Sequence, residues 1–85
     1  MPKRKCACCG YYTLISEQPG SYEFCPVCYW TDDPRQRQNH DLVVSPNSLS
    51  LNEARKNFRK YGAYTEYCKQ FVRPPKDDEY SGIDD

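Results

Sequence analysis

The chain has 85 residues and a formal net charge of zero; 38% of its residues are hydrophobic and 28% are charged. A chain of this length forms at most one domain with a modest core, so a metal ion, a disulfide or a partner is expected to supply part of its stability. The balanced charge argues against strong electrostatic binding of nucleic acid or membrane, and no run approaches the roughly 20 apolar residues that a membrane-spanning helix needs.

The chain contains six cysteines, which are too many for packing alone. No apolar run follows the basic residues at the start, so we expect no secretory signal and a cytoplasmic location. Thiols stay reduced in the cytoplasm, where cysteine pairs bind metal more often than they form disulfides. Metal binding is therefore the favoured interpretation, and a disulfide framework is the alternative.

The first predicted element is a β-hairpin that carries both cysteine motifs. Residues 11–15 and 22–24 are rich in aromatic and β-branched side chains, and Pro19-Gly20 between them is typical of a turn. Each strand adjoins one Cys-x-x-Cys motif. Pairing of these two strands would bring the motifs together.

The two motifs predict one structural zinc ion. The first is followed by Gly10, which permits the backbone to curl beneath the ion, and 15 residues separate it from the second. Zinc favours four sulfur ligands in a tetrahedron, and such a closed shell leaves no position for a catalytic water. The predicted ligands are Cys6, Cys9, Cys25 and Cys28. Iron in a rubredoxin-like redox site is the alternative for the same ligands.

The other two cysteines are not predicted to bind the ion. Cys8 is too close to Cys9 to span the turn with it, so we expect a spare thiol; a redox-sensing thiol is the alternative. Cys68 is expected to be a small buried hydrophobe. His40 lies in a polar loop and is expected to be a solvated side chain. A second metal site formed by Cys8, Cys68 and His40 is the alternative, but their spacing fits no motif.

The region 32–46 contains several turn-forming residues and predicts a loop, with a short strand at residues 42–44. Asp32 or Asp33 is expected to cap a turn before Pro34, and Trp30 to cover the second cysteine turn. The two carboxylates could also support acid–base chemistry, but no nucleophile accompanies them.

The main helix is predicted from Ser50 to Gly62. Residues 50–53, Ser-Leu-Asn-Glu, match a capping box, and Gly62 suits the helix end. A stripe of apolar residues follows helical spacing, formed by Leu51, Ala54, Phe58 and Tyr61. A shorter helix is predicted around residues 67–72. From residue 76 the chain is polar and acidic, which predicts a disordered tail over 76–85 and a single domain over 1–75.

The predicted fold is thus a small α+β domain, in which a zinc-ribbon-like hairpin packs against one main helix and a short C-terminal helix. The expected core residues are Leu14, Tyr22, Phe24, Trp30, Leu51, Ala54, Phe58 and Phe71.

Several segments together resemble the cysteine-rich CPCC family of small bacterial proteins. They are Cys6-x-Cys8-Cys9-Gly10-Tyr11, then Tyr22-Glu23-Phe24-Cys25-Pro26-Val27-Cys28-Tyr29-Trp30, Asp32-Asp33-Pro34 and Ser50-Leu51-Asn52-Glu53-Ala54-Arg55. The resemblance covers roughly residues 6–75. Ala7 stands where the family's name places proline, which loosens the turn but removes no ligand. The resemblance implies a zinc-binding domain and carries over no activity.

Three classes of function compete. The sequence shows no Gly-rich phosphate loop, no catalytic Ser or Cys–His arrangement and no open metal site. A protein-interaction or regulatory module is favoured, because a closed metal site with exposed tyrosines offers recognition without chemistry. A nucleic-acid-binding zinc ribbon is the second class, with Tyr11, Tyr12 and Tyr29 able to stack on bases. Four basic residues of the main helix are the candidate contacts to nucleic acid or another partner: Arg55, Lys56, Arg59 and Lys60. A thiol redox protein is the third class.

Overall fold

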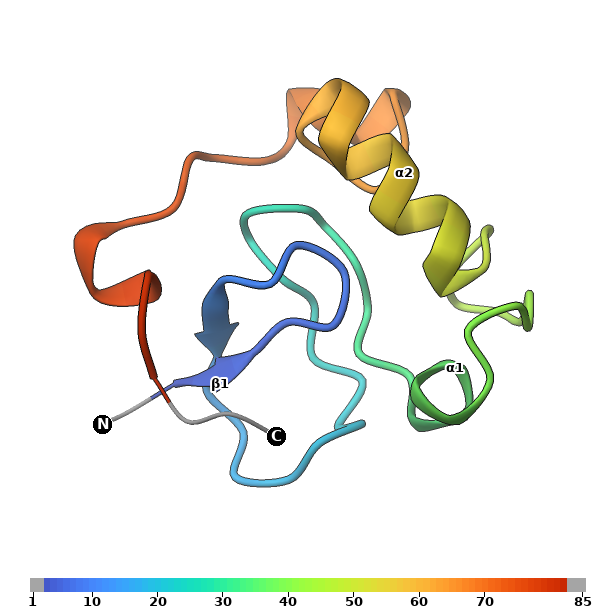
Figure 1. The fold of residues 1–85 in the computed structure, drawn as a ribbon, viewed down its shortest axis with the longest axis horizontal. Coiled ribbons are helices and arrows are strands. Elements are labelled where there is room, and N and C mark those ends of the chain that lie inside the picture. The colour runs from blue at the N-terminus through green and yellow to red at the C-terminus, as the bar shows by residue number, and fades with distance from the viewer. Residues whose placement is uncertain (1–2, 83–85) are drawn as a thin grey trace.

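The structure is a computed structural model and describes residues 3–82. It confirms the predicted small α+β class (Figure 1). The elements in chain order are β1 (Arg4–Lys5), β2 (Tyr12–Leu14), α1 (Pro34–Gln38), α2 (Leu51–Tyr61) and two 3-10 helices, η1 (Tyr67–Gln70) and η2 (Asp77–Glu79). Within the described part of the chain, no helix combines the length and apolar character needed to cross a bilayer.

The strands pair differently from the prediction. β1 pairs antiparallel with β2, with Arg4 opposite Leu14, and Phe24 forms an isolated bridge with Thr31. The predicted pairing of residues 11–15 with 22–24 is therefore wrong. Each cysteine turn is closed by pairing of its own flanking segments, because the segment before each motif is the nearest partner for the segment after it.

An unpredicted helix, α1, lies in the region expected to be a loop. Asp33 is its N-cap and accepts a hydrogen bond from the Arg35 backbone N–H at 2.8 Å, while Pro34 occupies the first turn. The side chain of Gln36 is buried and donates hydrogen bonds to two backbone oxygens of the following loop, those of Leu42 and Leu49. These bonds hold residues 42–44 as a loop in place of the expected strand.

The main helix agrees with the prediction. Ser50 caps α2 by accepting a hydrogen bond from the Glu53 backbone N–H at 3.2 Å, and Gly62 ends it in the left-handed conformation, with φ of 79°. Leu51 and Ala54 are fully buried. The apolar stripe of α2 therefore packs over the cysteine turns.

The core is small, and five of the predicted core residues contribute to it. Leu14, Trp30, Leu51 and Ala54 are buried, and Phe58 packs partly against them. Three other predicted core residues are wrong, since they remain about half exposed: Tyr22, Phe24 and Phe71. Phe24 illustrates the reason, because neighbouring residues of an extended segment point to opposite sides and its neighbour Cys25 faces inward. The buried core cluster includes four cysteines, Cys6, Cys8, Cys25 and Cys28.

Residues 76–82 differ from the expected disordered tail. Glu79 in η2 is fully buried, and both its carboxylate oxygens accept hydrogen bonds from the Arg73 guanidinium at 2.8 Å. Lys3 lies 3.4 Å from the same carboxylate, so the C-terminal segment is fastened beside β1 (Figure 1). The Arg73 hydrogen bonds hold the pKa of Glu79 at about 2. The remainder of the predicted tail, 83–85, lies outside the described residues.

Candidate metal centre

Four cysteine side chains converge between the two turns. The Sγ atoms of Cys6, Cys9, Cys25 and Cys28 all lie within 4.8 Å of one another. Cys6 Sγ is 3.6 Å from Cys28 Sγ, and Cys9 Sγ is 3.7 Å from Cys25 Sγ. These separations are far longer than a disulfide bond of about 2.05 Å. The four thiols selected from the sequence are thus free and are positioned to hold a metal ion.

The two cysteine turns have the same backbone design. In the first, the Gly10 N–H donates to the Cys6 carbonyl at 3.0 Å; in the second, the Tyr29 N–H donates to the Cys25 carbonyl at 2.7 Å. The residue after each motif has a positive φ, 81° at Gly10 and 71° at Tyr29. This conformation suits glycine and strains tyrosine, so the second turn is held in place by its surroundings.

We expect Gly10→Ala to lower the free energy of unfolding by about 1 kcal/mol, because a side chain in the left-handed region is strained. No atom lies within 4 Å of a Cβ added at this position, so the effect is conformational and steric overlap does not contribute. Urea denaturation of the metal-loaded protein would measure it. Unchanged stability would show that the turn does not require this backbone conformation.

Contacts outside the sulfur cluster hold each turn. The Tyr64 N–H donates to the Cys28 carbonyl at 2.8 Å, and the Arg73 N–H donates to the Pro26 carbonyl at 3.2 Å. In the first turn, the Arg55 Nε donates to the Ala7 carbonyl at 2.8 Å. The C-terminal half of the chain therefore fixes both turns around the cluster.

One further side chain touches a sulfur atom directly. The Thr13 hydroxyl lies 2.9 Å from Cys25 Sγ, and Thr13 is buried. A hydroxyl at this distance donates a hydrogen bond to a thiolate and stabilises its charge. Sequence analysis did not identify Thr13, because alternation along β2 places it on the side opposite to the core residue Leu14, whereas both side chains are buried.

The crowded thiols strongly perturb one another. Hydrogen bonds from Cys28 and the other thiols lower the pKa of Cys25. Burial raises the pKa of Cys28, and the hydrogen bond with Cys25 raises that of Cys9. In the absence of an ion, one thiolate is thus favoured at the expense of its neighbours. A bound cation reverses this, because it stabilises the thiolate form of all its ligands.

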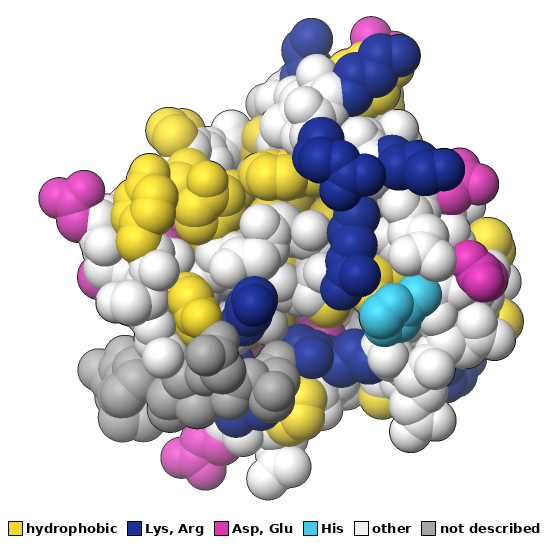
Figure 2. Space-filling model, viewed as in Figure 1, with side chains coloured by type: hydrophobic (Ala, Val, Ile, Leu, Met, Phe, Trp, Pro, Cys, Tyr) yellow, Lys and Arg dark blue, Asp and Glu magenta, His cyan; other side chains and the backbone are white. Residues whose placement is uncertain are grey.

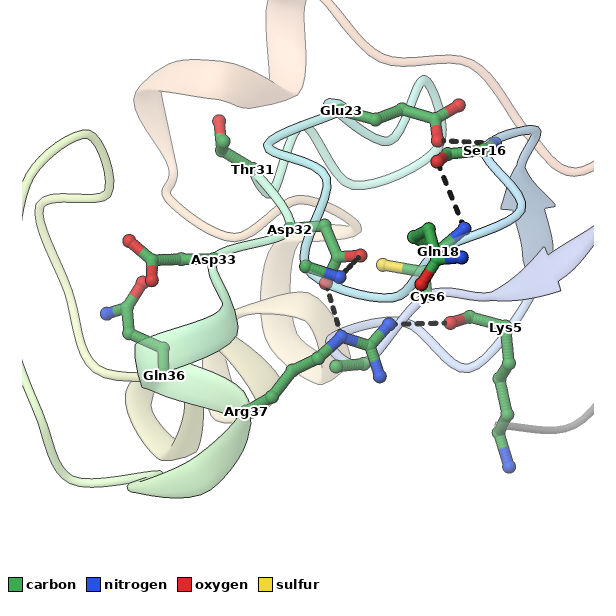
Figure 3. A network of polar contacts seen from close by, with 12 residues as sticks. Lys5, Cys6, Ser16, Gln18, Glu23, Thr31, Asp32, Asp33, Gln36 and Arg37 are labelled. Carbon is green, nitrogen blue, oxygen red and sulfur yellow. Dashed lines mark hydrogen bonds and ion pairs between the residues drawn. The ribbon is translucent and has the colours of Figure 1, made fainter.

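The polar network beneath the first turn was only partly expected. Buried Asp32 accepts a hydrogen bond from the Gly20 N–H at 2.8 Å and pairs with Arg37 Nε at 2.5 Å. Arg37 also donates to the Lys5 carbonyl at 3.3 Å, so its side chain connects α1 to the strand that leads into Cys6 (Figure 3). Sequence analysis predicted that Asp32 or Asp33 caps a turn before Pro34. In the structure Asp33 has this role, as the N-cap of α1. Sequence analysis missed the link made by Asp32.

The remaining cysteines and the histidine do not belong to the cluster of four. Cys8 and Cys68 are buried, in agreement with the expected burial of Cys68. His40 is only partly exposed, and its Nε2 lies 3.2 Å from the Arg37 carbonyl oxygen. Trp30 is buried and packs edge-on against Tyr64, with ring centroids 5.6 Å apart.

The basic residues of α2 are placed along one surface. Figure 2 shows a column of Lys and Arg side chains that ends beside the histidine. Arg55 is half-buried, whereas Lys56, Arg59 and Lys60 are exposed. Among residues 3–82, none of these four side chains forms an ion pair.

Comparison with known proteins supplies the family. The sequence model of the family described as "Cysteine-rich CPCC" matches residues 4–79, which is most of the chain and includes both cysteine turns, α2 and η2. A comparison with curated proteins returned no match. The chain belongs to the cysteine-rich CPCC family.

Proposed function

We propose that the protein is a small binding module organised by one structural zinc ion. The sulfur geometry supports a tetrahedral metal site. Four sulfurs at about 2.3 Å in a tetrahedron lie about 3.8 Å apart, and two Sγ pairs are already separated by 3.6 and 3.7 Å. With all four positions taken by thiolates, zinc supplies stability and offers no site to a substrate. Six free thiols favour a reducing compartment such as the cytoplasm.

Metal analysis of protein purified without chelator tests the zinc assignment. One equivalent of zinc in a colourless protein is expected. An iron site with four sulfurs would be coloured and redox-active, and finding it would replace zinc in the proposal.

The binding partner that we propose is another protein, and one exposed cluster of rings carries this proposal. Its residues, here called the aromatic surface, are Phe24, Tyr29, Tyr67 and Phe71. Tyr29 stacks on Phe71 with ring centroids 5.4 Å apart, and Phe24 and Tyr67 flank this pair at 5.5 and 5.6 Å. Phe24, Tyr67 and Phe71 are 58%, 71% and 50% exposed.

These rings make a preformed recognition surface. Large rings that already contact one another lose little conformational freedom when a partner covers them, and such residues dominate protein interfaces. An apolar groove of about 250 Å³ adjoins Phe71 through Val72 and is also lined by Val27, Phe58 and the prolines after Arg73. Figure 2 shows hydrophobic side chains gathered over the segment that follows η1. The partner expected is therefore a protein segment with apolar side chains.

We expect Phe71→Ser to weaken binding of the partner by about tenfold or more, because truncating a residue that acts as a binding hot spot costs about 2 kcal/mol or more and such residues lie near the centre of an interface. The measurement compares proteins recovered from the native host by wild-type and variant protein under identical conditions. Val43→Ser is the matched control, since Val43 is 59% exposed but belongs to the loop between α1 and α2. Equal recovery by all three proteins would contradict the assignment of this surface.

Nucleic-acid binding is the second candidate, and the unpaired basic residues of α2 favour it. A row of cations on one helix surface tracks phosphates and gives binding that weakens steeply with salt. Titration of mixed-sequence DNA and RNA at low and at physiological salt separates the two candidates. Absence of binding at low salt would eliminate the second.

A further inference from the structure

A cavity of about 590 Å³ lies on the outer side of the first cysteine turn. Three separate parts of the chain line it: the segment Lys5–Gly10, Arg37 and His40 at the end of α1, and Arg55 from α2. The volume falls within the range of small-molecule sites. None of these described lining residues is acidic, and three of them are permanently cationic. The wall of the cavity is thus suited to an anion.

The cations differ in how much of their charge is already balanced. Arg37 is paired with buried Asp32, so it acts mainly to fix the position of α1 beside Lys5. Neither Lys5 nor Arg55 forms an ion pair within residues 3–82. Two of the residues that line this cavity, from distant positions in the sequence, therefore carry a positive charge that no described carboxylate balances.

Arg55 is held in a position suited to ligand recognition. Its Nε donates to the Ala7 carbonyl at 2.8 Å, which fixes the guanidinium against the first turn. The two terminal nitrogens of the group make no hydrogen bond within the described residues, so their donors remain available. A fixed guanidinium with free donors binds phosphate oxygens in pairs and loses little side-chain freedom on binding.

The cations also lie near two metal-binding cysteines, Cys6 and Cys9, which line the same cavity. Their charge could therefore serve only to balance the thiolates. A hydrogen bond to a thiolate requires a short distance to sulfur, yet the Nε hydrogen bond of Arg55 goes to a backbone oxygen. Charge balance alone also does not account for a cavity of this size.

We propose that this cavity binds the phosphate group of a small phosphorylated molecule, with Arg55 and Lys5 as the residues that contact the phosphate. The site is independent of the aromatic surface and of any protein partner. Inorganic phosphate and a phosphate monoester share the chemistry that these residues recognise, and the volume leaves room for the organic part of a monoester.

The test uses the full-length, metal-loaded protein, with inorganic phosphate, adenosine monophosphate and adenosine as probes at constant ionic strength. Saturable shifts of the backbone amide signals of residues 5–10 are expected with both phosphates and not with adenosine. Tighter binding of adenosine monophosphate than of phosphate identifies a monoester site; equal binding identifies a site for phosphate itself. Bound zinc is measured after each titration, so that loss of metal is not mistaken for binding.

Arg55→Gln is expected to weaken binding at least tenfold. Arg59→Gln, one helical turn further along α2 and outside the cavity lining, is expected to change it less than twofold. Three results would overturn the proposal: no saturable shift at millimolar phosphate; equal weakening by both variants, which indicates a diffuse basic surface; and zinc loss by Arg55→Gln without any phosphate binding by the wild type.

Discussion

Cys25→Ser and Cys28→Ser are each expected to unfold the domain at neutral pH. Both side chains are completely buried, and each supplies one of the four sulfurs that converge between the turns. A structural zinc site contributes on the order of 10 kcal/mol, comparable to the entire stability of a small domain, so the loss of one ligand leaves too little to maintain the fold. Amide NMR spectra and zinc analysis of the purified variants would measure the effect.

Cys8→Ser is the matched control, because Cys8 is buried beside the same turn but lies outside the cluster of four. We expect it to retain zinc and to change stability by about 1 kcal/mol, the usual scale for placing a hydroxyl in a buried site with partial compensation. If Cys8→Ser released zinc as readily as Cys6→Ser, the ligand assignment would be wrong.

Glu79→Gln is expected to lower the free energy of unfolding by about 3 kcal/mol at pH 7. The folded protein holds the pKa of Glu79 at about 2, against an ordinary value of 4.5, chiefly through hydrogen bonds from Arg73. Each pKa unit corresponds to about 1.4 kcal/mol. Because the pKa is lowered on folding, this contribution is complete above pH 4.5 and is lost as pH falls toward 2. A urea denaturation curve of metal-loaded protein at neutral pH therefore measures all of it.

Asp77→Asn provides the comparison, since Asp77 belongs to the same 3-10 turn and is exposed. We expect it to change stability by less than about 0.5 kcal/mol, as is usual for a surface position. Similar losses for Asp77→Asn and Glu79→Gln would show that the net charge of the segment matters and that the specific contacts of Glu79 do not.

The sequence predicted the features that depend on short-range patterns. The paired cysteine spacing identified the four converging thiols, since each motif specifies its own turn. Ser50 and Gly62 marked both ends of α2 because capping depends on residues within one helical turn. The burial of Leu51 and Ala54 followed from the same periodicity.

The features that the sequence did not predict depend on contacts between distant residues. The choice of β1 as the partner of β2 could not be read from a two-residue strand that carries only basic side chains. Glu79 belongs to an acidic run that looks solvated, and its burial follows from Arg73 and Lys3, the latter 76 positions away. The cavity at the first turn likewise combines residues from three segments that share no motif.

The ion pairs of Glu79 place residue 82 next to residue 3: a Cβ added at Gly82 would overlap the Lys3 carbonyl oxygen. The first and last described residues therefore lie at the same place on the surface of the domain. Domains with adjacent ends can be inserted into a loop of a host protein without separating the two sides of that loop. The same geometry makes this fold suitable for circular permutation, with residues 3 and 82 connected through a short linker.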